Sequence, residues 1–141
     1  MKKVIIGIII AILVVIAIGF FGVIALIAVP NLTGVQNRSQ VNADIRTAEQ
    51  IAKAINIWSV DGINRKVPTT VIEYNELEQI EEYFAGDYKP TSLKDAEYYV
   101  VSQDGKIKIA IAKEASDVNK LVSDDVYEGK GAGWAYVEGQ Y

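Results

Sequence analysis

The pattern of hydrophobic and polar positions divides the chain at Pro30. Residues 4–29 contain no charged, amide or hydroxyl side chain. As a helix rising ~1.5 Å per residue, this run would span roughly 39 Å, more than the ~30 Å hydrocarbon core of a bilayer. Lys2 and Lys3 precede it, and basic residues favour the cytoplasmic side. The run therefore predicts a transmembrane helix that leaves the rest of the chain outside the cell.

A second helical pattern follows Pro30. Apolar residues recur there mostly at spacings of three and four, which is typical of an amphipathic helix. We expect one helix from about Lys3 to about Trp58, kinked at Pro30 because proline removes a backbone hydrogen bond. The apolar positions of the second half are Leu32, Val35, Val41, Ile45, Ala48, Ala52 and Ile55.

Strand signals lie in the last third of the chain. Residues 96–103 and 106–112 flank Asp104-Gly105, a strong hairpin signal between alternating runs. Ile107, Ile109 and Ile111 should face the amphipathic half of the helix. A last strand is expected over residues 134–137, and a short helix over residues 74–84. These elements predict an α+β fold, with a long kinked helix packed on an antiparallel sheet of about three strands.

The expected organisation has four parts. Residues 1–7 form a possible basic leader, and residues 4–29 form the apolar half of the helix. Residues 30–58 form its amphipathic half, and residues 59–141 form a globular domain. The predicted contacts between helix and sheet are made by Ile45, Ala48, Ala52, Ile55, Ile107, Ile109 and Ile111.

The composition excludes several chemistries. The chain has neither Cys nor His, so disulfides, thiolate metal sites and catalytic centres that use His cannot form. All 18 Asp and Glu residues lie after Pro30, and an acidic domain repels nucleic acid. Exposed acidic residues at Glu76, Glu78, Glu81 and Glu82 suit a solvated helix face. We expect no enzyme activity, no cofactor and no metal.

Three stretches of the helix carry a family resemblance. They are Leu-Val-Val-Ile-Ala-Ile at 13–18, Ala-Leu-Ile-Ala-Val-Pro-Asn-Leu at 25–32 and the amphipathic run at 41–57. Together they resemble the N-terminal region of type IV pilins and pseudopilins, over roughly the first 58 residues. The resemblance implies a pilin-like fold and cleavage of a leader between Gly7 and Ile8. The family's aromatic first residue and its Glu at the fifth position are Ile8 and Ile12 here.

The resemblance also implies a function. It implies a structural subunit of a type IV pilus-like surface filament that serves adhesion, motility, DNA uptake or secretion. The subunit would wait in the cytoplasmic (inner) membrane, and pilus assembly machinery would pack it with copies of itself or related pilins in an extracellular pilus. The residues expected in the membrane or filament core include Val14, Val15, Ile16, Phe20, Phe21, Ile24, Leu26 and Ile27. The alternative is a single-pass, membrane-anchored extracellular binding protein that does not polymerise.

Overall fold

The computed structural model describes the backbone of residues 1–140 and the side chains of residues 1–16 and 37–140. The chain forms two compact units, Met1–Gln36 and Asn37–Tyr141. Helix α1 (Lys2–Asp61) contributes residues to both units. Where the side chains are described, no helix is both long enough and apolar enough to cross a membrane.

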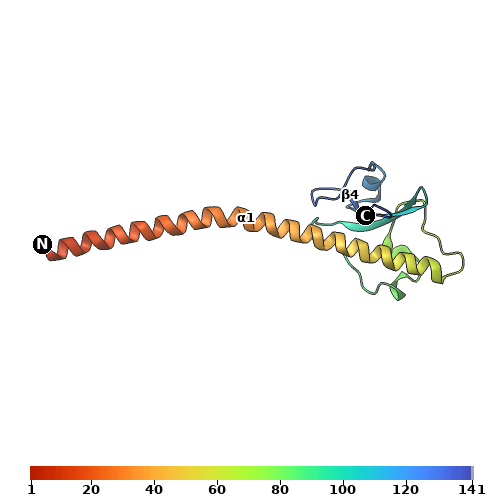
Figure 1. Ribbon diagram of the computed structural model, residues 1–141, viewed down its shortest axis with the longest axis horizontal. Coiled ribbons are helices and arrows are strands. Elements are labelled where there is room, and N and C mark those ends of the chain that lie inside the picture. Colours follow the sequence, from red (N-terminus) through yellow and green to blue (C-terminus); the bar gives the residue numbers. More distant parts are fainter. Residues whose placement is uncertain (141) are drawn as a thin grey trace. The chain divides into compact units, whose positions relative to one another are not determined.

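The second unit is built on a four-stranded antiparallel sheet. Its strands are β1 (Ile72–Glu73), β2 (Glu97–Gln103), β3 (Lys106–Ala112) and β4 (Gly133–Val137), and they lie in the order β1-β2-β3-β4. The sheet lies beside the last part of α1, which is yellow in Figure 1.

The hairpin between β2 and β3 is present where the sequence predicts it. Asp104 and Gly105 both have positive φ, 53° and 74°, as a two-residue hairpin turn requires. The strands pair in continuous register from Gln103 opposite Lys106 to Glu97 opposite Ala112. The pairing of β3 with β4 shifts register between Ile109 and Ala110, where Ala135 is the extra residue of a bulge in β4.

One face of the sheet packs on α1. Ala48, Ile51, Ala52 and Ile55 are fully buried, and Trp58 is nearly so. Their spacing of three and four places them on one side of the helix. They share a core with sheet residues from β2 and β3, which are Tyr98, Val100, Ile107, Ile109 and Ile111.

The other face of the sheet carries a second apolar cluster. Tyr99, Val101 and Ala110 from the sheet meet Val118 of the short helix α2 (Ala115–Val118) and Trp134 of β4. Both sides of the sheet are therefore covered by the chain itself, which is why alternate residues of β2 and β3 are buried on either face.

The predicted pilin-like architecture is wrong, although the α+β class and the antiparallel sheet are present. The sheet has four strands and not about three, because the two-residue strand β1 adds to the edge at β2. A pilin-like long apolar helix is not shown, since the described side chains of the apolar run end at residue 16. The predicted kink at Pro30 also lies outside the described side chains.

The short helix expected over residues 74–84 is also wrong. Two 3-10 turns, η1 (Tyr74–Glu76) and η2 (Ile80–Glu82), occupy this segment. Gln79 separates them with a left-handed backbone, φ 63°, which an α-helix cannot contain. Tyr74, Leu77 and Ile80 nevertheless reach the core on the α1 face.

Candidate functional site

Residues 4–16 of α1 form an aliphatic surface. No described residue of the first unit covers it. Every Val, Ile and Leu side chain from Val4 to Ile16 is between 51% and 69% exposed. No side chain in this run can form a hydrogen bond or an ion pair. We call residues 4–16 the apolar helix surface. What it can do chemically is bury itself in lipid or against other apolar helices.

Three of the predicted filament-core residues have described side chains. Val14, Val15 and Ile16 belong to the apolar helix surface and are exposed. The predicted leader junction of Gly7 and Ile8 lies inside α1, and its cleavage stays a prediction. The remaining predicted core residues lie outside the described side chains, namely Phe20, Phe21, Ile24, Leu26 and Ile27.

The predicted contacts between helix and sheet all fall in the second unit. Ala48, Ala52 and Ile55 are buried in the cluster that also holds the three isoleucines of β3. Ile45 is partly buried at the edge of the same cluster.

A buried carboxylate joins α1 to two distant loops. Asp44 is only 3% exposed, and its oxygens accept the backbone N–H groups of Thr91 at 3.0 Å and Ser92 at 2.8 Å. The hydroxyls of Thr91 and Ser92 also donate to it, and Ser92 contacts the Tyr127 hydroxyl. This network fixes the 87–96 segment on the helix, and it explains how a carboxylate is tolerated in the core.

Asp44 was missed by the sequence analysis, although a signal exists. It lies four residues before Ala48 and three after Val41, so it falls on the apolar face of the helix. A charged residue at a core position requires partners within the chain.

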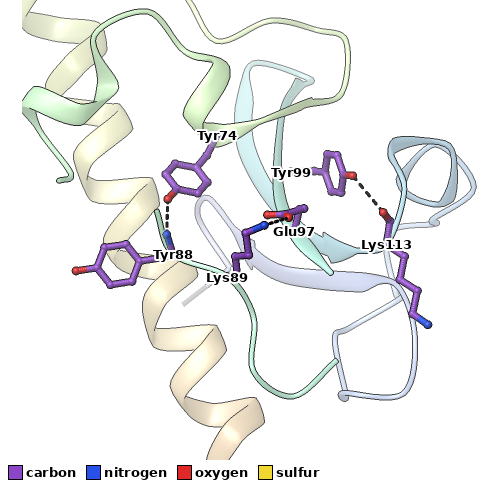
Figure 2. A network of polar contacts seen from close by, with 6 residues as sticks. All are labelled: Tyr74, Tyr88, Lys89, Glu97, Tyr99 and Lys113. Atoms are coloured by element: carbon purple, nitrogen blue, oxygen red, sulfur yellow. Dashed lines mark hydrogen bonds and ion pairs between the residues drawn. The ribbon is translucent and has the colours of Figure 1, made fainter. Parts of the chain in front are cut away.

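Tyrosine hydroxyls complete the polar contacts around the sheet (Figure 2). The Tyr74 hydroxyl accepts the Tyr88 backbone N–H at 2.9 Å, and Lys89 pairs with Glu97 at 2.9 Å. Burial raises the pKa of Tyr74. Burial also raises the pKa of Glu73, and the nearby Glu97 adds to that shift. These contacts tie the loop that holds Tyr88 and Lys89 to Tyr74 of η1 and to Glu97 of β2.

A cleft lies at the C-terminal end of α1. It has a volume of about 540 Å³, and its lining includes Trp58, Arg65, Gln79 and Glu78. The Arg65 guanidinium lies 5.6 Å from the ring centroids of both Trp58 and Tyr83, and it donates to Gln79 Oε1 at 2.6 Å. Trp58 Nε1 donates to the Glu78 carbonyl at 2.7 Å. Arg65 is thus engaged by the protein's own groups.

The acidic residues around η2 face solvent. Glu76, Glu78, Glu81 and Glu82 are all exposed. Among the described residues, no group of three or more carboxylates or other ligand side chains could hold a metal ion.

Comparisons with known proteins give no match. No protein-family model fits the chain, and no curated protein or solved structure is significantly similar to it.

Proposed function

We propose that the chain is a structural subunit of a type IV pilus-like surface filament, assembled through its apolar N-terminal segment. Its partners are copies of itself or related pilins, together with the membrane and the machinery that assembles the filament. It stays in the cytoplasmic membrane before assembly and on the cell surface afterwards. It acts by assembly and not by catalysis.

The exposed apolar helix surface carries this proposal. Burying one Val, Leu or Ile side chain contributes about 1.5–3 kcal/mol when it is fully exposed beforehand. Residues 4–16 include eleven such side chains that are each more than half exposed. Covering their exposed halves contributes on the order of 8–17 kcal/mol, which is comparable to or larger than the cost of association, about 4–15 kcal/mol. Lipid before assembly and neighbouring helices after assembly would both cover the same surface.

The second unit supports the proposal in a different way. Both faces of its sheet are already covered by its own chain, and its buried side-chain polar atoms have hydrogen-bond partners where the structure describes them. Such a unit needs no ligand to be complete. It suits the outer coat of a filament, where a stable domain faces solvent.

The cleft beside Trp58 favours a second candidate function. A single-pass anchored protein would use a surface cleft to bind an extracellular partner, and a volume of about 540 Å³ suffices for a small ligand. In this alternative the apolar segment remains in lipid and the chain never leaves the membrane.

Immunogold electron microscopy of whole cells separates the two functions. Antibody raised against residues 37–140 should decorate filaments that extend from the cell surface. The filament proposal fails if gold particles are confined to the cell envelope while the protein is abundant there. A strain that lacks the chain is the control, and it should show unlabelled filaments or none.

Mass spectrometry of the native N-terminus tests the processing step. A mature chain that begins at Ile8 is expected if the leader is removed between Gly7 and Ile8. An intact Met1 would overturn cleavage at this junction and favour the anchored alternative.

A further inference from the structure

The cleft at the C-terminal end of α1 carries charges of both signs. Its lining includes Arg65 and Lys66 on the loop after the helix, and Glu76 and Glu78 on the segment that holds the 3-10 turns. Lys66, Glu76 and Glu78 are exposed, and Arg65 is partly buried. The ion pairs formed by the described residues lie elsewhere, so these four charges do not neutralise one another in direct contacts.

Arg65 keeps an unpaired positive charge in the wall of this cleft. Its Nη1 donates to the Trp58 carbonyl at 3.4 Å and to the Tyr83 hydroxyl at 3.0 Å, and its Nη2 donates to Gln79 Oε1 at 2.6 Å. All three acceptors are neutral. A guanidinium has more N–H donors than these bonds use, so Arg65 retains donors that have no acceptor among the described residues. A carboxylate is the group that such donors bind best.

The two walls of the cleft are joined before any ligand binds. Trp58 Nε1 donates to the Glu78 carbonyl at 2.7 Å, and the bond from Arg65 to Gln79 links the same two segments. The Arg65 side chain lies over Gly62, where an added Cβ would fall 2.0 Å from Arg65 Cδ. The guanidinium is therefore held in one place, and little order would be lost on binding.

Apolar side chains line the cleft beside these charges. Ile63 is 94% exposed, and Pro68 and Ile72 are partly buried in the same lining. A small aliphatic group on a ligand would remove this apolar surface from water. The volume of about 540 Å³ lies in the range of sites that bind small molecules.

We propose that this cleft binds a small zwitterion, namely an α-amino acid with an aliphatic side chain. Arg65 receives its carboxylate, and Glu76 and Glu78 attract its ammonium group. A simple anion is repelled by the two glutamates, and a simple cation is repelled by Arg65 and Lys66, so only a ligand with both charges is attracted by both walls. The inference goes beyond the filament proposal and names a ligand class for the cleft that the anchored alternative uses.

Calorimetric titration of the full chain in detergent tests the ligand class with three probes of the same shape. L-leucine carries both charges, 4-methylpentanoate lacks the ammonium group, and 3-methylbutylamine lacks the carboxylate. We expect leucine to bind at least about tenfold more tightly than either analogue, because each analogue loses one charge-assisted contact. The absence of leucine binding would overturn the proposal, and so would an analogue that binds as tightly as leucine.

Variants of the two walls test the roles of the residues. Arg65→Lys keeps the charge and loses the planar fork, so leucine should bind about tenfold more weakly. Glu76→Gln combined with Glu78→Gln should also weaken leucine, yet it should tighten 4-methylpentanoate because the repulsion of its carboxylate is removed. A loss of folding cannot produce these opposite changes.

The matched control is Glu81→Gln. Glu81 is exposed on η2 and does not belong to the lining of the cleft. This variant should leave the affinities for leucine and for 4-methylpentanoate unchanged. An equal loss of leucine binding in the control and in the double variant would show that overall charge, and not the cleft, attracts the ligand, and it would overturn the site.

The outcome is separable from the proposed function. Labelled filaments from a chain that does not bind leucine would overturn the site and leave the filament subunit in place. Leucine binding by a chain that forms no labelled filaments would support the site and overturn the filament.

Discussion

Two stretches of the same helix contain similar residues and have opposite surroundings. Residues 4–16 are aliphatic, and their large side chains are all more than half exposed. Ile51, Ala52 and Ile55 are just as apolar and are completely buried. The difference is that β2 and β3 fold over the second stretch, whereas no described residue of the first unit covers residues 4–16. Burial of an apolar helix depends on which residues cover it, and among the described residues of its own unit the first stretch has none.

The largest expected effect comes from truncating isoleucine in each stretch. Ile55→Ala should lower the free energy of unfolding of the second unit by about 3–5 kcal/mol, because it leaves a cavity in a fully buried site. Ile12→Ala should change it by less than about 0.5 kcal/mol, since Ile12 is 54% exposed. Denaturant unfolding in detergent, followed by the fluorescence of Trp58 and Trp134, measures both variants. Equal destabilisation would remove the distinction between the two stretches.

The second prediction concerns the stability that Asp44, a buried polar residue of α1, gives to the second unit. Asp44→Ala should destabilise the second unit by about 2–3 kcal/mol, because the N–H groups of Thr91 and Ser92 lose their acceptor. Asp124→Ala is the matched control, since Asp124 is exposed and its side chain accepts a described hydrogen bond only from Ser123. The control should stay within about 0.5 kcal/mol of the parent. Similar unfolding midpoints for the two variants would show that Asp44 does not hold the loop.

Titration of tyrosines at alkaline pH should lower the stability of the second unit only, because the apolar helix surface has no tyrosine. Burial raises the pKa of Tyr98 above its ordinary value of 10.0, and Asp44 adds to the shift. The unfolded chain then releases this proton first, so stability that is present below pH 10.0 is lost as the pH rises above it. Tyr98→Phe should lose about 1 kcal/mol at neutral pH and show a shallower decline above about pH 10.

Unfolding curves of both proteins between neutral and alkaline pH measure this slope. The buried hydroxyls of Tyr74, Tyr99 and Tyr127 also have raised pKa values, so part of the decline should persist in Tyr98→Phe. An unchanged slope in the variant would rule out Tyr98 as a contributor.

The smallest effect concerns Glu73 in the edge strand β1. Its pKa is raised by burial and by Glu97, so the folded state holds the proton more tightly than the unfolded chain. Stability from this group is present below the ordinary value of 4.5 and is lost as the pH rises through the higher folded pKa. Glu73→Gln should therefore stabilise the second unit at neutral pH by a few tenths of a kcal/mol, because partial exposure screens the charges. The gain should vanish at acidic pH, and a gain that persists there would show a cause other than charge.

Local signals predicted the parts of the fold that depend on a few neighbouring residues. Asp104-Gly105 fixes a hairpin wherever it occurs between strands, and the alternation of Ile107, Ile109 and Ile111 sets one face of β3. Ala110, on the opposite face of β3, is fully buried. It is covered by Val118 and Trp134, which are distant in sequence.

The features that were missed depend on tertiary contacts. Strand β1 has two residues and exists only because it pairs with β2. The break at Gln79 has no glycine or proline to mark it. The Asp44 network joins residues 47 and 48 positions apart in the chain, so spacing alone could not reveal it.

Thiol protection in sheared surface filaments tests the central claim most directly. Ile12→Cys and Gln50→Cys are compared for their reaction with a water-soluble maleimide in the extracellular fraction. The account predicts that the chain is present in that fraction, that the thiol at position 12 is protected until detergent dissociates the filament, and that the thiol at position 50 reacts at once. A chain that stays wholly in the membrane fraction, or a thiol at position 12 that reacts as fast as the one at position 50, would contradict it.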